Sequence, residues 1–163
     1  MDRIQYVLYW KIENFSLARH KMGEKLVSPV FPTKMLDNTS WTLELYPEGV
    51  EDESYIGGFL TRNTGISSLD CEVHYDLTVA PGGDLNDGGR GNRFTFKLGQ
   101  TDGFPLLVKR KAIEMANKDL NVDFLTLRCR IYLQSVKNYN FVGKSFARTR
   151  LLADGTSYSI LQK

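Results

Sequence analysis

Imidazole and thiol groups are the side chains most often used for catalysis and zinc binding, and this chain contains few of them. Its histidines are His20 and His74, and its cysteines are Cys71 and Cys129. Side chains of an extended segment alternate between two faces, so Cys71 and His74 point to opposite sides. The four residues share no metal-ligand spacing. We therefore predict no intrinsic enzymatic activity, no metal site and no cofactor, and expect both cysteines to be buried free thiols.

A glycine-rich run over residues 82–92 invites a phosphate-binding or calcium-binding interpretation. A phosphate loop leaves a strand and opens a helix, whereas this run precedes a strand pattern that begins at Arg93. An EF-hand loop counted from Asp84 would need an oxygen ligand at its fifth position, which is Gly88, and a Glu at its twelfth, which is Thr95. We predict a hairpin connection, because glycine and asparagine tolerate positive φ.

Aromatic residues form the third group with binding potential: Phe59, Phe94, Phe96 and Phe104. Period-two alternation places Phe94, Phe96 and Leu98 on one face of a strand. In a β-sandwich such residues are usually buried in the core. A concave sheet face can instead form an apolar trough, where backbone amides at the edge bind an extended peptide.

The elements that must position these residues are predominantly strands. Alternation of apolar and polar residues is clearest over 41–46, 71–80 and 125–133, and weaker over 5–12, 25–31, 55–61 and 93–98. One helix is predicted, with Pro105 as its first residue and its end at Asn117. The pattern predicts an all-β antiparallel sandwich of seven to eight strands with one short helix.

Length and composition are consistent with one domain and a tail. The chain has 163 residues, 25% of them charged, and a formal net charge of +2. That charge is too small and dispersed for nucleic-acid binding. No stretch approaches a membrane span or a signal sequence. We expect a soluble protein of the nucleus or cytoplasm, with a domain over 1–134 and a tail or linker over 135–163, where the alternation stops.

Four motifs occur in the order found in MATH domains of the TRAF-like superfamily. They are YWKIENFS at 9–16, WTLELYPEG at 41–49, GF at 103–104 and LTLRC at 125–129. Residues 5–134 resemble such a domain, and most of all that of the speckle-type POZ proteins. The resemblance implies a TRAF-like (MATH) sandwich, which agrees with the strand pattern.

The resemblance also implies a function. In speckle-type POZ proteins the MATH domain recruits substrates through short Ser/Thr-rich peptides, and a following BTB domain binds a cullin scaffold. This chain contains no BTB domain, but residues 150–154 are similar to the segment that leads into one. We expect a non-enzymatic peptide-recognition domain of a ubiquitin-ligase adaptor, monomeric in isolation, whose cullin contact requires the absent domain.

Two other full-length proteins remain open as alternatives. One is a TRAF-type signalling adaptor, although no heptads precede residue 2. The other is a deubiquitinase that its MATH domain targets. The sequence beyond Lys163 would discriminate between these alternatives and the ligase adaptor.

Only some of the residues that form the family's peptide groove are the same at the matching positions of this chain. Phe59 and Phe94 stand where the family has groove tyrosines, and Val73 where it has a phenylalanine. The family's Lys-Asp-Trp-Gly-Phe run matches residues 100–104, and Phe96 matches directly. The implied peptide-binding residues are Phe59, Val73, Phe94, Phe96, Gln100, Thr101, Asp102, Gly103 and Phe104.

Asp102 departs furthest from that pattern, because it replaces the family's tryptophan. A carboxylate at the groove predicts weak binding of acidic or phosphorylated peptides and a preference for Lys or Arg near a Ser/Thr core. The alternative is that Asp102 caps a turn at Gly103 and faces solvent.

Overall fold

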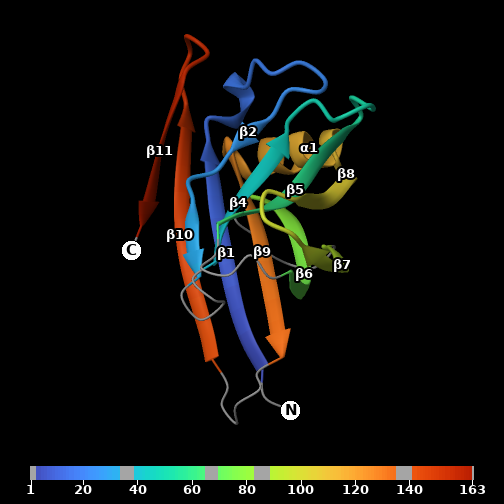
Figure 1. Cartoon of the computed structure of the whole chain (residues 1–163). Coiled ribbons are helices and arrows are strands. Elements are labelled where there is room, and N and C mark those ends of the chain that lie inside the picture. The colour runs from blue at the N-terminus through green and yellow to red at the C-terminus, as the bar shows by residue number, and fades with distance from the viewer. Residues whose placement is uncertain (1–2, 34–38, 65–69, 83–88, 135–140, 163) are drawn as a thin grey trace.

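The computed structural model describes residues 3–33, 39–64, 70–82, 89–134 and 141–162. Strands dominate these ranges and form two sheets packed face to face (Figure 1). The strands are β1 (Arg3–Glu13), β2 (Leu26–Val27), β3 (Phe31–Thr33), β4 (Thr39–Tyr46), β5 (Tyr55–Thr64), β6 (Cys71–Pro81), β7 (Arg90–Phe96), β8 (Thr101–Lys109), β9 (Phe124–Gln134), β10 (Phe141–Leu151) and β11 (Ser157–Gln162). The helices are a 3₁₀ turn, η1 (Phe15–Leu17), and α1 (Arg110–Leu120). The predicted all-β sandwich with one α-helix is confirmed, but the described residues form eleven strands where the sequence predicted seven to eight.

The order of the strands decides which edges are open to a partner. The six-stranded sheet runs β11-β10-β1-β9-β6-β7, and the five-stranded sheet runs β2-β4-β5-β8 with β3 also paired to β4. β1 pairs with β10 in parallel, while its other neighbour, β9, is antiparallel. β7 and β8 therefore each end a sheet.

Alternating apolar side chains from both sheets make the core, as the pattern predicted. Trp10 and Trp41 are completely buried there. Their indole nitrogens are still satisfied, since Trp10 Nε1 donates to Thr149 Oγ1 at 2.8 Å and Trp41 Nε1 to Thr33 Oγ1 at 3.0 Å. The Trp10–Thr149 bond therefore connects β1 with β10, two strands that are distant in the sequence.

The helix begins later than the sequence predicted. Pro105 lies in β8, and α1 runs from Arg110 to Leu120, with Asn121 as a left-handed C-cap (φ 55°). β8 tolerates the proline because an edge strand leaves one side of its backbone unpaired. The alternation of exposed Leu106 with buried Leu107 is that of a strand.

The segment after residue 134 also differs from the prediction. β10 and β11 extend the six-stranded sheet, so residues 141–162 are not a tail or linker. The inward positions of β10 are small, such as Ala147 beside Trp10 and Thr149 bonded to its indole. Small inward residues suppressed the apolar alternation that marks a strand.

Other expectations concern loops and absent features. β6 and β7 pair antiparallel on either side of the glycine-rich run, but residues 83–88 lie outside the described part of the chain. Cys129 is buried as predicted, whereas Cys71 is only half-buried; neither forms a disulfide. No helix among the described residues has the length and hydrophobicity needed to cross a bilayer.

Candidate functional site

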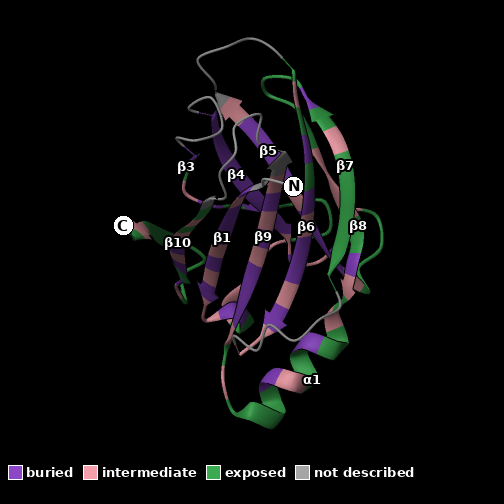
Figure 2. Cartoon of the chain, turned by 90° about the horizontal axis from the view of Figure 1, so that it is seen from below, coloured by how far each residue is buried: buried purple, intermediate pink, exposed green. Residues whose placement is uncertain are grey.

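The open edges of the two sheets meet on one side of the molecule. β7 ends the six-stranded sheet and β8 ends the five-stranded sheet, and the two strands lie side by side (Figure 2). Most side chains of β7 are exposed, but Phe96 at its end is completely buried. This edge combines a strand with exposed backbone and an adjoining apolar interior, the combination on which strand addition depends.

Aromatic rings connect this edge to the core. The ring centroids of Phe94 and Phe96 are 4.7 Å apart, and Phe96 packs edge-to-face on Trp41 at 5.2 Å. Tyr75 lies between Phe96 at 5.9 Å and Phe104 at 6.2 Å. Phe94 and Phe104 are half-buried, so they are the rings that a ligand can reach.

We call five residues on the facing sides of β6, β7 and β8 the edge cluster: Val73, Tyr75, Phe94, Phe96 and Phe104. Val73 is opposite Phe94 in the β6–β7 ladder and is almost completely buried. Val73 and Phe96 therefore support the cluster from beneath, whereas Phe94 and Phe104 form its accessible part.

Asp102 lies in β8 and is directed at this cluster. Its Oδ2 accepts hydrogen bonds from the Tyr75 hydroxyl and from Asn92 Nδ2, the latter at 2.9 Å. Burial, and then the hydrogen bond to Asp102, raise the pKa of Tyr75 far above its ordinary value. The expectation that Asp102 caps a turn at Gly103 is wrong, because both residues are within a strand.

Three of the predicted site residues face the other way. Phe59 pairs with Gly103 across β5 and β8, and Thr101 Oγ1 lies 2.6 Å from Thr61 Oγ1 on the same face. The ring of Phe59 packs edge-to-face on Tyr46. A Cβ at Gly103 would lie 2.6 Å from the Phe59 Cα, so glycine is what lets these strands approach. Phe59, Thr101 and Gly103 thus flank the back of β8 rather than the edge cluster.

Gln100 belongs to the turn between β7 and β8. Its Oε1 accepts a bond from the Lys97 amide at 3.0 Å, which closes the turn. Arg62 is buried next to this turn, with 1% of its surface exposed. Its Nη1 donates a hydrogen bond to the Phe96 carbonyl at 2.9 Å. Its backbone also bonds to Gly99 and Gln100. A buried guanidinium is therefore bonded to the end of β7, where Phe96 lies.

Sequence reasoning did not identify Tyr75, Asn92 or Arg62 as parts of this site. Tyr75 carried a weak signal, because it is the one residue with a hydroxyl on the inward face of its strand. Asn92 lay in the glycine-rich run, and Arg62 lay at the end of a weak strand pattern. Their partners are 10 to 34 residues away in the chain, beyond the reach of local patterns.

The groups with catalytic potential are not assembled. His74 is exposed on the outer face of β6 and packs edge-to-face on Tyr132, on the opposite side from Cys71. Burial raises the pKa of the Cys129 thiol well above its ordinary value. Within the described ranges, no three His, Cys, Asp or Glu side chains are grouped closely enough to hold a metal ion.

The chain matches the MATH domain family over residues 7–131. It belongs to the MATH domain family. MATH domains mediate protein–protein interaction, and the matched range includes all of β4 to β8 and hence the whole edge cluster. The match ends within β9, so β10 and β11 lie outside it.

Proposed function

We propose that this MATH domain binds short Ser/Thr-containing linear motifs in a shallow groove formed by the edge cluster. The peptide lies along β7, whose backbone supplies hydrogen bonds, and its apolar side chains contact Phe94 and Phe104. The observation that carries this proposal is the meeting of two open sheet edges over half-buried aromatic rings.

The charge of Asp102 supports a preference for basic peptides. Its two hydrogen bonds come from neutral donors, which stabilise the carboxylate but do not cancel its charge. A Lys or Arg near the Ser/Thr core of a peptide gains from that charge, and an acidic or phosphorylated residue is repelled.

The full-length protein is, in this proposal, a substrate adaptor of a BTB/cullin ubiquitin ligase in the nucleus or cytoplasm, with no catalysis of its own. The support is the sequence resemblance of residues 5–134 and 150–154 to speckle-type POZ proteins. Full-length protein isolated from cells should co-purify with a cullin. Deubiquitinase activity or a TRAF-type trimer in that preparation would contradict the adaptor role.

Peptide binding is tested on the domain itself. We would screen a Ser/Thr peptide array and measure the affinity of the strongest binder by calorimetry for the wild type and for Phe94→Ala. Removal of a central aromatic contact is expected to weaken binding about tenfold. The control is Phe59→Ala, which also truncates a half-buried ring, but one on β5 that lies on the face of the five-stranded sheet away from the edge cluster.

The two variants distinguish a groove at the edge cluster from a groove on the other face of β8. Equal losses in both variants, or a loss only in Phe59→Ala, would move the groove away from the edge cluster.

Asp102→Asn keeps an oxygen acceptor for Tyr75 and removes the charge, so it should reduce the preference for basic over acidic peptides. An unchanged preference would show that Asp102 does not read peptide charge.

A further inference from the structure

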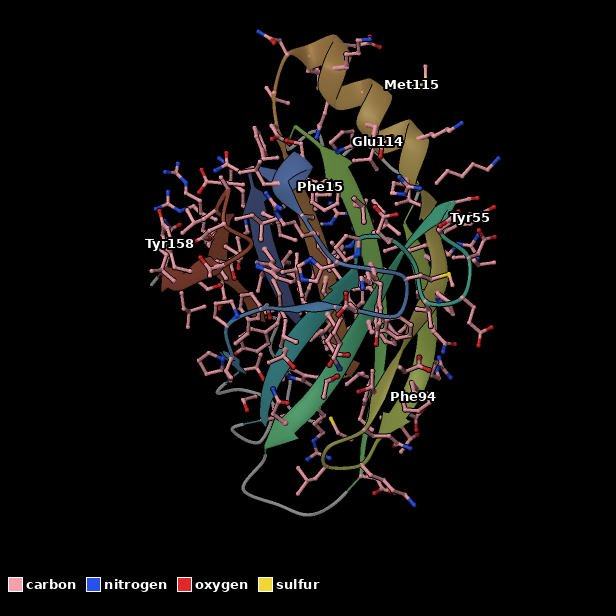
Figure 3. All side chains as sticks on the ribbon, turned by 90° about the horizontal axis from the view of Figure 1, so that it is seen from above. Phe15, Tyr55, Phe94, Glu114, Met115 and Tyr158 are labelled. Carbon is pink, nitrogen blue, oxygen red and sulfur yellow. The ribbon has the colours of Figure 1, made fainter. Side chains whose placement is uncertain are left out.

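The outer face of the six-stranded sheet carries a second arrangement of rings and charges. β1 and β10 pair in parallel, which places Tyr9 opposite Phe146 and Lys11 opposite Arg148. Tyr158 on β11, next to β10, lies on the other side of the molecule from Phe94 of the edge cluster (Figure 3). This face is therefore separate from the proposed groove.

The two rings form an exposed apolar platform. Tyr9 and Phe146 stack with centroids 4.9 Å apart and planes 9° from parallel, and Phe146 is 44% exposed. They border a hollow of about 320 Å³ that Lys11, Arg148 and Thr126 also line. None of the described residues lining the hollow is acidic. A ligand here meets two rings, two cations, the hydroxyls of Tyr9 and Thr126, and the side-chain amide of Gln162.

The positive charges beside the platform are incompletely compensated. Like charges directly opposite each other in a sheet are destabilising, and Lys11 faces Arg148. Glu13 is shared, since its carboxylate lies 3.1 Å from Arg148 Nε and 3.4 Å from Arg150 Nη2. The Lys11 ammonium instead lies 4.3 Å from the centre of the Phe124 ring, which leaves its charge intact. One carboxylate thus stands among three cations.

The charges further along this face favour a protein ligand over a nucleic acid. Asp76 is paired with Arg130 at 2.8 Å, so acidic side chains are interspersed among the basic ones on this sheet. A chain of phosphates laid over the face would pass Glu13 and Asp76, and the net charge of the chain is only +2. A single acidic side chain beside an apolar one needs only the hollow itself, and none of the described residues that line the hollow is acidic.

We propose that this hollow binds an acidic segment of a partner protein, with a Glu or Asp carboxylate between Lys11 and Arg148 and a neighbouring aromatic side chain on the Tyr9–Phe146 platform. The site depends on β10, which lies outside the matched residues 7–131.

The test is fluorescence anisotropy with a labelled peptide of alternating Glu and Phe, and with the matching Gln and Phe peptide. Wild-type protein should bind the first and not the second, more weakly as salt is added. Lys11→Gln should weaken binding about tenfold, the usual order for one lost charge-assisted contact. Lys111→Gln removes an exposed lysine from α1 and should leave binding unchanged.

Each alternative result overturns the proposal. Equal binding of the Gln peptide, or an equal loss in Lys111→Gln, would mean that no specific cation reads the carboxylate. A loss in Phe94→Ala would place the peptide at the edge cluster. Tighter, competing binding by a single-stranded oligonucleotide would assign the face to nucleic acid. Lys11→Glu is the converse variant, which should bind a peptide of alternating Lys and Phe. Its urea midpoint should be no lower than that of the wild type, because the substitution removes one of two facing cations.

Discussion

The edge cluster and the β1–β10 face both set aromatic rings beside charge, but they treat that charge differently. At the edge cluster a single carboxylate, Asp102, is held inside by the hydroxyl of Tyr75 and the amide of Asn92. On the β1–β10 face the charges of Lys11 and Arg148 are oriented outward around one shared carboxylate. In the first arrangement neighbouring side chains hold the charge in place by hydrogen bonds, and in the second the charges are more exposed to solvent and to a ligand.

The difference predicts how binding at each region responds to salt. Charge held by hydrogen bonds in a partly buried site is screened little, whereas exposed charges are screened within roughly 10 Å at ordinary ionic strength. Peptides at the edge cluster should therefore keep most of their affinity in high salt, and peptides on the β1–β10 face should lose most of theirs.

The largest expected effect is on the stability of the edge cluster. Asp102→Leu removes the acceptor of the Tyr75 hydroxyl, and Tyr75 is completely buried. An unsatisfied buried donor costs about 2 kcal/mol of unfolding free energy, which urea denaturation measures. In a double-mutant cycle, Tyr75→Phe should restore part of the loss. Independent, additive effects of the two substitutions would show that this hydrogen bond is not part of the structure.

The second effect concerns pH. Because the pKa of Tyr75 is raised in the folded protein, the unfolded chain loses this proton first, at the ordinary tyrosine value of about 10. The stabilisation is complete below that pH and is lost as pH rises above it. Urea midpoints between about pH 9 and pH 11 should fall more steeply for the wild type than for Tyr75→Phe.

The control for alkaline unfolding is Tyr158→Phe, which removes an exposed tyrosine. It accounts for the general effect of deleting one phenol from the chain. If Tyr75→Phe and Tyr158→Phe give the same slope as the wild type, the buried hydroxyl contributes nothing to the pH dependence.

The smallest effect is expected on the β1–β10 face. Glu13→Gln removes the carboxylate that Arg148 and Arg150 share and should destabilise the fold by about 1 kcal/mol or less, mainly at low salt. Adding Lys11→Gln should recover part of this loss, because it removes one of the facing cations. Urea titrations at two salt concentrations measure both changes. A loss that salt leaves unaltered would indicate a packing defect rather than charge repulsion.

The sequence predicted the strands whose inward residues are large and apolar. Cys71–Pro81 and Phe124–Gln134 alternate clearly because they are central strands with one face on the core. β10 escaped prediction because its inward positions include the small residues Ala147 and Thr149, while Val142 and Phe146 are exposed. β8 escaped because Gly103 and Pro105 are common helix and turn signals, and only its edge position tolerates them.

The candidate site was predictable only in part. Local alternation placed Phe94 and Phe96 on one face, and the family resemblance supplied Phe104 and Asp102. The faces of β8 are set by its register with β5, which no local pattern reveals, so the separation of Phe59 from Asp102 appears only in three dimensions. The pairing of Tyr75 with Asp102 is equally non-local, since 27 residues separate them.

The position of β1 between β9 and β10 has a consequence for how the chain reaches this fold. The first strand completes its pairing only with strands from the far end of the chain, as the bond from Trp10 to Thr149 across 139 residues illustrates. Such distant contacts make folding slow, because long loops must close before any gain is made. During synthesis on the ribosome, both edges of β1 stay unpaired until β9 and β10 have emerged, and unpaired strand edges favour aggregation during that interval.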